Sequence, residues 1–312
     1  METQIVLITL ISVGIMLAYA VPGFATIKSK LIKPDAIPAF ATILMYVCQP
    51  CLTIYSLNNV DYSWNLFKTM LIFFGISFAI QLAFIVVFFL IFKNKYDDVK
   101  YRIFTIAAAS GNCAFMGVPV LEAIMPDKPE AVTLSVAFLL GMNLIGWTLS
   151  SAIITRDKKY ISLKKAFINP AMVGLVIALP LFFTHTKLPS QISTMVTLLG
   201  KMTTPLCMII MGMRLATNSP KSIFLQPMQY GIIAIKQLIM PLLALLIVWF
   251  LPLELYVKQT MVILCATPVA SVVLNFAEML GEGQENAANL VLLGTSLSVV
   301  SIPFIVFIMT LI

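Results

Sequence analysis

Long apolar stretches follow one another along the whole chain and are separated by short polar ones. Reading for uninterrupted hydrophobic length predicts ten spans, each long enough to cross a hydrocarbon core of roughly 30 Å as a helix. We place these spans at residues 5–22, 36–57, 67–92, 102–125, 131–154, 166–184, 191–215, 229–251, 258–280 and 287–311. The pattern predicts an all-α integral membrane protein with ten transmembrane helices and no soluble domain.

Composition and charge agree with this interpretation. Of the 312 residues, 60% are hydrophobic and 11% are charged, and the mean hydropathy is +1.01, far from the values of soluble domains. The net charge of +7 does not indicate a nucleic-acid partner, because the basic residues are scattered between apolar stretches. The five cysteines lie inside apolar stretches, where thiols pack as small hydrophobes.

The basic residues between the spans predict the orientation. Fourteen Lys and Arg residues follow the first, third, fifth and seventh spans, whereas four follow even-numbered spans. Basic loops stay in the cytoplasm, so we expect both termini outside a bacterial-type cytoplasmic (plasma) membrane. Residues 1–4 include no Lys or Arg, and residues 5–22 therefore predict a permanent span rather than a cleaved signal peptide.

The two halves of the chain correspond at a nearly constant offset. Gln-Pro-Cys-Leu at 49–52 corresponds to Thr-Pro-Leu-Cys at 204–207, 155 residues later. Leu-Glu-Ala at 121–123 corresponds to Ala-Glu-Met at 277–279, 156 residues later. We expect one five-helix repeat at 1–155 and a second at 156–312. Because five is odd, the second copy enters from the opposite side, which makes a 5+5 inverted-topology repeat.

Spans four and nine contain matched helix breakers. At the offset of 156, Asn112 pairs with Pro268 and Pro119 pairs with Asn275. Irregular backbone is tolerated at membrane depth only where protein buries it or it lines a cavity. We predict that the broken helices 4 and 9 cross at the bilayer midplane and aim half-helix N-termini at an anion. The alternative is that these residues only kink their helices.

The predicted substrate site gathers polar and helix-breaking residues from four spans. Its members are Asn112, Cys113, Gly117, Pro119, Thr267, Pro268, Asn275, Lys201, Pro50 and Pro205, and the possible coupling-ion ligands are Ser110, Thr267 and Ser271. A lysine at membrane depth is costly unless it has a partner, so Lys201 would pair with a carboxylate substrate, unless it forms a structural ion pair or lies at the surface. Pro50 and Pro205 alternatively only bend their helices. We expect Lys236 at a cytoplasmic helix end, extended toward the headgroups.

Several other kinds of site are not indicated. No Asp, Glu or His falls at the middle of a span, and Glu122 and Glu278 are expected as solvated interface acids. Cys48 and Cys51 have C-x-x-C spacing but no βαβ context, so we do not expect a redox role. With no P-loop or catalytic motif, we expect neither an enzyme nor a cofactor or metal, apart from possible coupling to Na⁺ or H⁺.

These motifs together resemble the auxin efflux carrier family, whose bacterial members include malate and malonate permeases. The similar segments lie at residues 111–119, 169–170, 204–206, 211–213, 267–270 and 295–298. The resemblance implies a scaffold of spans one, two, six and seven, a transport unit around crossing helices 4 and 9, an elevator-type movement of organic anions, and a homodimer.

From the residues and the resemblance together, we expect a secondary transporter of small organic anions, mono- or dicarboxylates such as malate or malonate, in a lipid bilayer. A sodium-coupled symporter of the bile acid type and an ion channel remain alternatives.

Overall fold

The computed structural model describes residues 2–157, 161–162, 164, 168–218, 223–224 and 226–311. In these ranges the chain is helical, and the strand-like pairing is one isolated bridge. The expected all-α architecture is confirmed for the described residues.

Helices follow one another through both halves of the chain. The first half contains α1 (Glu2–Ala18), α2 (Ala20–Lys28), α3 (Ile37–Ile43), α4 (Gln49–Asn58), α5 (Trp64–Phe92), α6 (Val99–Ala107), α7 (Val118–Ile124), α8 (Pro129–Ile145) and α9 (Ser151–Thr155). The second half contains α11 (Pro170–Phe183), α12 (Ser190–Lys201), α13 (Thr203–Thr217), α15 (Pro227–Ala234), α16 (Met240–Trp249), α17 (Leu255–Ala266), α18 (Val272–Leu280) and α19 (Gln284–Thr310).

Seven described helices are long and apolar enough to cross a membrane by length and composition. They are Gln4–Lys28, Pro34–Asn58, Trp64–Lys95, Pro129–Thr155, Ser190–Thr217, Pro227–Trp249 and Gln284–Thr310. The predicted spans 102–125 and 258–280 are each interrupted, which leaves the shorter helices Cys113–Ile124 and Leu255–Ala266. The span expected at 166–184 begins outside the described residues. The ten-helix inverted repeat and its boundary at 155/156 stay predictions.

Wide π turns continue several spans through a proline. The π turns Leu44–Cys48, Cys113–Gly117 and Ile235–Ile239 each end two residues before a proline, at Pro50, Pro119 and Pro241. A proline ring lacks the backbone N–H and clashes with the carbonyl of the previous turn, and widening that turn makes room for the ring.

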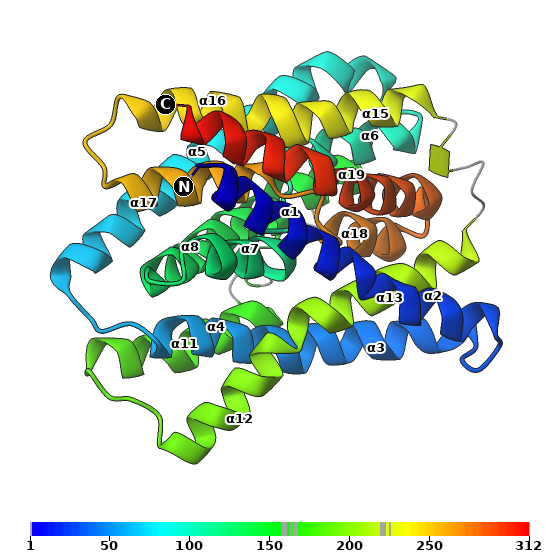
Figure 1. Ribbon diagram of the computed structural model, residues 1–312. Coiled ribbons are helices and arrows are strands. Elements are labelled where there is room, and N and C mark those ends of the chain that lie inside the picture. Colours follow the sequence, from blue (N-terminus) through cyan, green and yellow to red (C-terminus); the bar gives the residue numbers. More distant parts are fainter. Residues whose placement is uncertain are drawn as a thin grey trace.

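The helices form two groups, which Figure 1 shows one above the other with α1 crossing in front of them. We call α2, α3, α4, α11, α12 and α13 the lower group, and α5 to α8 with α15 to α19 the upper group. Both ends of the chain lie at the left of this view, where α1 packs on α19.

Glycines bring the backbones of the lower group into direct contact. A Cβ added at Gly23 of α2 would collide with the carbonyl of Ile209, and one at Gly212 of α13 with that of Ala20. Between α11 and α4, a Cβ at Gly174 would lie 2.5 Å from the carbonyl oxygen of Pro50. Small residues allow such close approach in membranes, so the lower group is a tightly packed unit.

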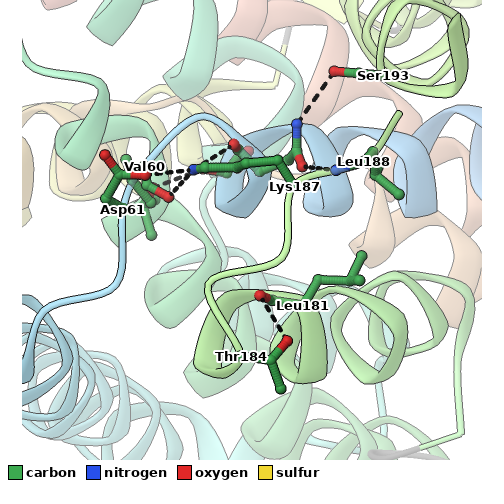
Figure 2. Close-up of polar contacts among 10 residues, drawn as sticks. Val60, Asp61, Leu181, Thr184, Lys187, Leu188 and Ser193 are labelled. Atoms are coloured by element: carbon green, nitrogen blue, oxygen red, sulfur yellow. Dashed lines mark hydrogen bonds and ion pairs between the residues drawn. The ribbon is translucent and has the colours of Figure 1, made fainter. Parts of the chain in front are cut away.

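At one end of the lower group, a lysine forms hydrogen bonds and an ion pair with the end of α4 and the residues after it, as Figure 2 shows. Lys187 Nζ donates to the carbonyl oxygens of Asn58, 2.9 Å, and Val60, 2.6 Å, and lies 2.9 Å from Asp61 Oδ1. The Asn58 side chain accepts a hydrogen bond from Leu188 N and donates one to Ser193. A cation is favourable at the C-terminal end of α4, and the contacts tie α4 to α12.

Candidate functional site

Two interruptions in the upper group meet at the centre of the molecule. We call residues 108–112, between α6 and the π turn Cys113–Gly117, the first break, and residues 267–271, between α17 and α18, the second break. Asn112 N donates to Pro268 O at 2.8 Å, and Ala270 N donates to Ser110 O at 3.0 Å. These two bonds form an antiparallel bridge between Gly111 and Val269. The predicted crossing of the broken helices is therefore present.

The sequence at the crossing allows this close approach. Pro268 has no N–H to leave unpaired, and its carbonyl oxygen accepts the bond from Asn112. A Cβ added at Gly111 would lie 2.7 Å from Thr267 Oγ1 and 3.1 Å from Lys236 Nζ, so any larger residue at position 111 would have to displace these side chains.

A cavity of about 400 Å³ lies between the two groups of helices, and the crossing forms its floor. The floor residues are Gly111, Asn112, Cys113, Ala270 and Ser271. The lower group contributes Met45, Tyr46, Gln49, Cys207, Met211 and Arg214, and the upper group contributes Leu139, Met142, Asn143, Phe276 and Glu278, among others. A mainly apolar cavity with a few polar groups is typical of a small-molecule site.

Five of the residues that line this cavity carry side-chain amides: Gln49, Asn112, Asn143, Asn169 and Asn275. Asn112 is 5% exposed, and Asn275 Nδ2 has only a weak contact with Met45 Sδ at 3.5 Å. Asn143 Nδ2 is buried and has no hydrogen-bond partner among the described residues. A buried donor without a partner is costly, so a ligand with acceptor oxygens would satisfy it. The helix α18 also begins at the cavity, and its positive dipole end favours an anion, although Val273 N and Leu274 N already donate to Ala270 O and Ser271 O.

The expectation that Lys236 reaches the headgroups is wrong. Lys236 lies in the π turn Ile235–Ile239, and its side chain is 0% exposed. Its Nζ donates to the carbonyl oxygens of Cys265, 2.6 Å, and Thr267, 2.9 Å, at the C-terminal end of α17. The freed carbonyls of the second break give the ammonium partners inside the protein, and the negative end of α17 stabilises its charge.

The structure divides the predicted site residues among four places. Asn112, Cys113, Ser271 and Asn275 line the cavity. Ser110, Gly117, Thr267 and Pro268 lie in or beside the breaks, where the oxygens of Ser110, Thr267 and Pro268 already accept hydrogen bonds. Pro50 packs on Gly174 within the lower group.

The remaining predicted residues lie beyond the π turn Cys113–Gly117. Pro119, Lys201 and Pro205 line a second cavity of about 300 Å³ together with Tyr55 and Glu122. Lys201 is exposed at the end of α12, and its Nζ lies 5.4 Å from the ring centroid of Tyr55. The structure therefore brings Lys201 together with the second cavity and not with Asn112.

Two acids link the upper group to the lower group. Glu122 of α7 accepts a hydrogen bond from Tyr55 of α4 at 2.7 Å. Glu278 of α18 pairs with Arg214 of α13 at 2.9 Å. The two acids are 156 residues apart (278 − 122 = 156), so the predicted repeat relates them, one beside each cavity. The expectation of solvated interface acids missed these contacts.

Sequence reasoning also missed Asn143 as a cavity residue and misplaced Lys236. Each is a polar residue inside an apolar span, at 131–154 and 229–251. That signal was available in the sequence, since polar groups at membrane depth are functional candidates by default.

Comparison with known proteins identifies the family. No curated protein matches the chain. The family model described as membrane transport protein matches residues 6–306, which is nearly the whole chain and includes both breaks. The chain is a multi-pass member of the membrane transport protein family, the auxin efflux carriers.

Proposed function

We propose that this protein is a secondary transporter, a permease, of small organic anions, and that its substrates are mono- or dicarboxylates such as malate or malonate. The observation that carries the proposal is the cavity of about 400 Å³ on the crossing of the two breaks. Its walls are mainly apolar, the side-chain amides of Asn112, Asn143 and Asn275 line it, and the positive end of the α18 dipole lies beside it. A carboxylate supplies an acceptor for Asn143 Nδ2, which has no hydrogen-bond partner among the described residues.

The bound anion would cross by an elevator-type movement, with α1 and the lower group as scaffold and the upper group as transport unit. The contacts between the groups support this division. Glu122–Tyr55 and Glu278–Arg214 join side chains of the two groups, and both would break and re-form as the units slide. With the orientation expected from the basic loops, the cavity beside Arg214 and Glu278 opens to the cytoplasm and the structure is an inward-facing state.

Solute counterflow in proteoliposomes tests this proposal. Vesicles preloaded with unlabelled malonate, malate or a monocarboxylate should accumulate the same radiolabelled compound transiently and saturably. Asn112→Ala should abolish counterflow, because it removes the amide at the floor of the cavity. The matched control is Asn65→Ala, at an exposed position in α5, which should behave as the wild type. Normal counterflow by folded Asn112→Ala, or conductance that does not saturate, contradicts the assignment.

A further inference from the structure

The carbonyl oxygens at the end of α17 surround a positive charge that the protein itself supplies. Lys236 Nζ lies 2.6 Å from Cys265 O and 2.9 Å from Thr267 O. Among the described residues, the charged side chains that are buried are Arg102, at 7% exposure, and Lys236, at 0%. Carbonyl oxygens and a helix dipole, rather than a carboxylate, therefore hold this ammonium.

The ammonium lies directly behind the floor of the cavity. Gly111 belongs to the floor, and a Cβ built on Gly111 would be 3.1 Å from Lys236 Nζ. Lys236 Nζ therefore lies close to a residue that lines the space for the anion. Inside the protein, a fixed charge acts more strongly on an anion than it does in bulk solvent.

The same oxygens would otherwise form a cation site. In transporters with broken helices, unwound carbonyls and half-helix C-terminal ends coordinate the coupling ion. In this protein the carbonyls at the second break accept hydrogen bonds from the Lys236 ammonium instead. The backbone carbonyl oxygens of Ser110 and Pro268 accept hydrogen bonds from backbone N–H groups of the opposite break. These backbone oxygens therefore already have hydrogen-bond partners within the protein.

We propose that the Lys236 ammonium is the resident cation of this crossing, which takes the position of a coupling sodium ion and provides the counter-charge for a carboxylate in the cavity. The inference rests on the proposed function for the identity of the anion. The part that concerns the cation can be tested without any substrate. It predicts that transport needs no sodium and that removal of the side chain opens a site for an external cation.

Thermal unfolding of the purified full-length protein tests the cation site. Sodium chloride, methylammonium chloride and choline chloride are compared at equal ionic strength. The wild type should have the same Tm in all three salts. Lys236→Ala should lose several degrees in choline, and sodium or methylammonium should restore most of that loss by binding the vacated carbonyls. Lys68→Ala removes an exposed lysine and should show neither effect.

Three results overturn the inference. The first is saturable stabilisation of the wild type by sodium, which needs no variant. The second is folded Lys236→Ala with wild-type Tm, and the third is a destabilised variant that neither cation restores. If Lys236→Ala does not fold, Lys236→Met should not fold either, whereas Lys236→Arg should fold. In that case, a Lys236→Met variant that folds with wild-type Tm also overturns the inference.

Counterflow separates this inference from the proposed function. Carboxylate counterflow of equal rate in sodium and choline supports both. Counterflow that requires sodium agrees with the proposed function but contradicts the role of Lys236 as the resident cation. Absence of counterflow for every carboxylate contradicts the proposed function, while the thermal results still decide the cation site.

Discussion

The first break and the second break share a geometry and differ in chemistry. At the end of α6, the N–H groups of Ala109 and Ser110 donate to Ile106 O at 3.4 and 3.1 Å, so the backbone closes its own helix end. At the end of α17, the oxygens of Cys265 and Thr267 are bound by Lys236 instead. A backbone turn satisfies one helix end, and a charged side chain from another span satisfies the other.

In the predicted repeat, this difference between the breaks comes from one residue, Lys236. At the offset of 156, Gln237 corresponds to Gln81 (237 − 156 = 81) and Lys236 corresponds to Ile80 (236 − 156 = 80). Ile80 is a buried apolar residue of α5. Two similar halves can therefore build a crossing with one charged side, and an anion in the cavity meets the two breaks unequally.

The largest expected effect comes from removing the charge at the second break. Lys236→Met should lower uptake by at least about 100-fold, because each charge-assisted hydrogen bond contributes about 1.5–3 kcal/mol and about 1.4 kcal/mol corresponds to a factor of ten. Ile80→Met is the matched change in the other half and should cost less than about 1.5 kcal/mol. Initial uptake rates of the two variants, normalised to folded protein, give the comparison. Equal rates contradict the asymmetry.

A smaller effect is expected when the two breaks are pushed apart. The methyl group of Gly111→Ala would press on Thr267 Oγ1 and Lys236 Nζ, and such overpacking costs about 1–3 kcal/mol. Gly231→Ala is the control, because nothing lies within 4 Å of its added Cβ. We expect a lower Tm and slower uptake for Gly111→Ala only. A wild-type Tm together with wild-type uptake for this variant would contradict the close packing of Gly111 against Thr267 and Lys236.

The two acids that link the groups should also differ. Glu278→Gln leaves Arg214 without its carboxylate, and a partly exposed ion pair contributes up to about 1 kcal/mol, so we expect a maximal rate about fivefold lower. Glu122→Gln keeps a neutral acceptor for Tyr55 and should change the rate about twofold or less. Maximal rates and KM from counterflow check both. A change confined to KM contradicts a role in the movement of the groups.

The smallest effect is expected far from the crossing, at Lys187. The hydrogen bond and charge of Lys187 hold the pKa of Asp61 below its usual range, so the ion pair is present at neutral pH and is lost as the pH falls through that lowered pKa. Lys187→Met should lower Tm slightly at neutral pH and leave counterflow unchanged. The difference in Tm from the wild type should shrink in acid; impaired counterflow would assign this ion pair a role in transport.

The position of the crossing was predictable from the sequence because its cause is local. Proline and glycine weaken a helix at their own positions, and matched breakers in two spans predicted that residues 112 and 268 would meet, as the bond from Asn112 to Pro268 confirms. The cavity residues Cys113, Ser271 and Asn275 follow from the same reasoning, since they adjoin the breaks.

The partners of the lysines were not predictable in this way. A lysine in an apolar span either extends to the headgroups or finds acceptors inside the protein, and that choice depends on which helix packs beside it. Lys236 finds the free carbonyls of α17, which is a neighbour only in the folded protein. Lys201 lies at the middle of its span but on the face toward the second cavity.

The most direct test of the account is carboxylate binding to the purified protein in the complete absence of sodium. Thermal shift or calorimetry against a panel of mono- and dicarboxylates, in choline and in sodium buffers, should find saturable binding of equal affinity in both. Asn112→Ala should lose this binding and Asn65→Ala should keep it. Binding that appears only with sodium, or that survives in folded Asn112→Ala, would contradict an anion site on the crossing with Lys236 as its resident cation.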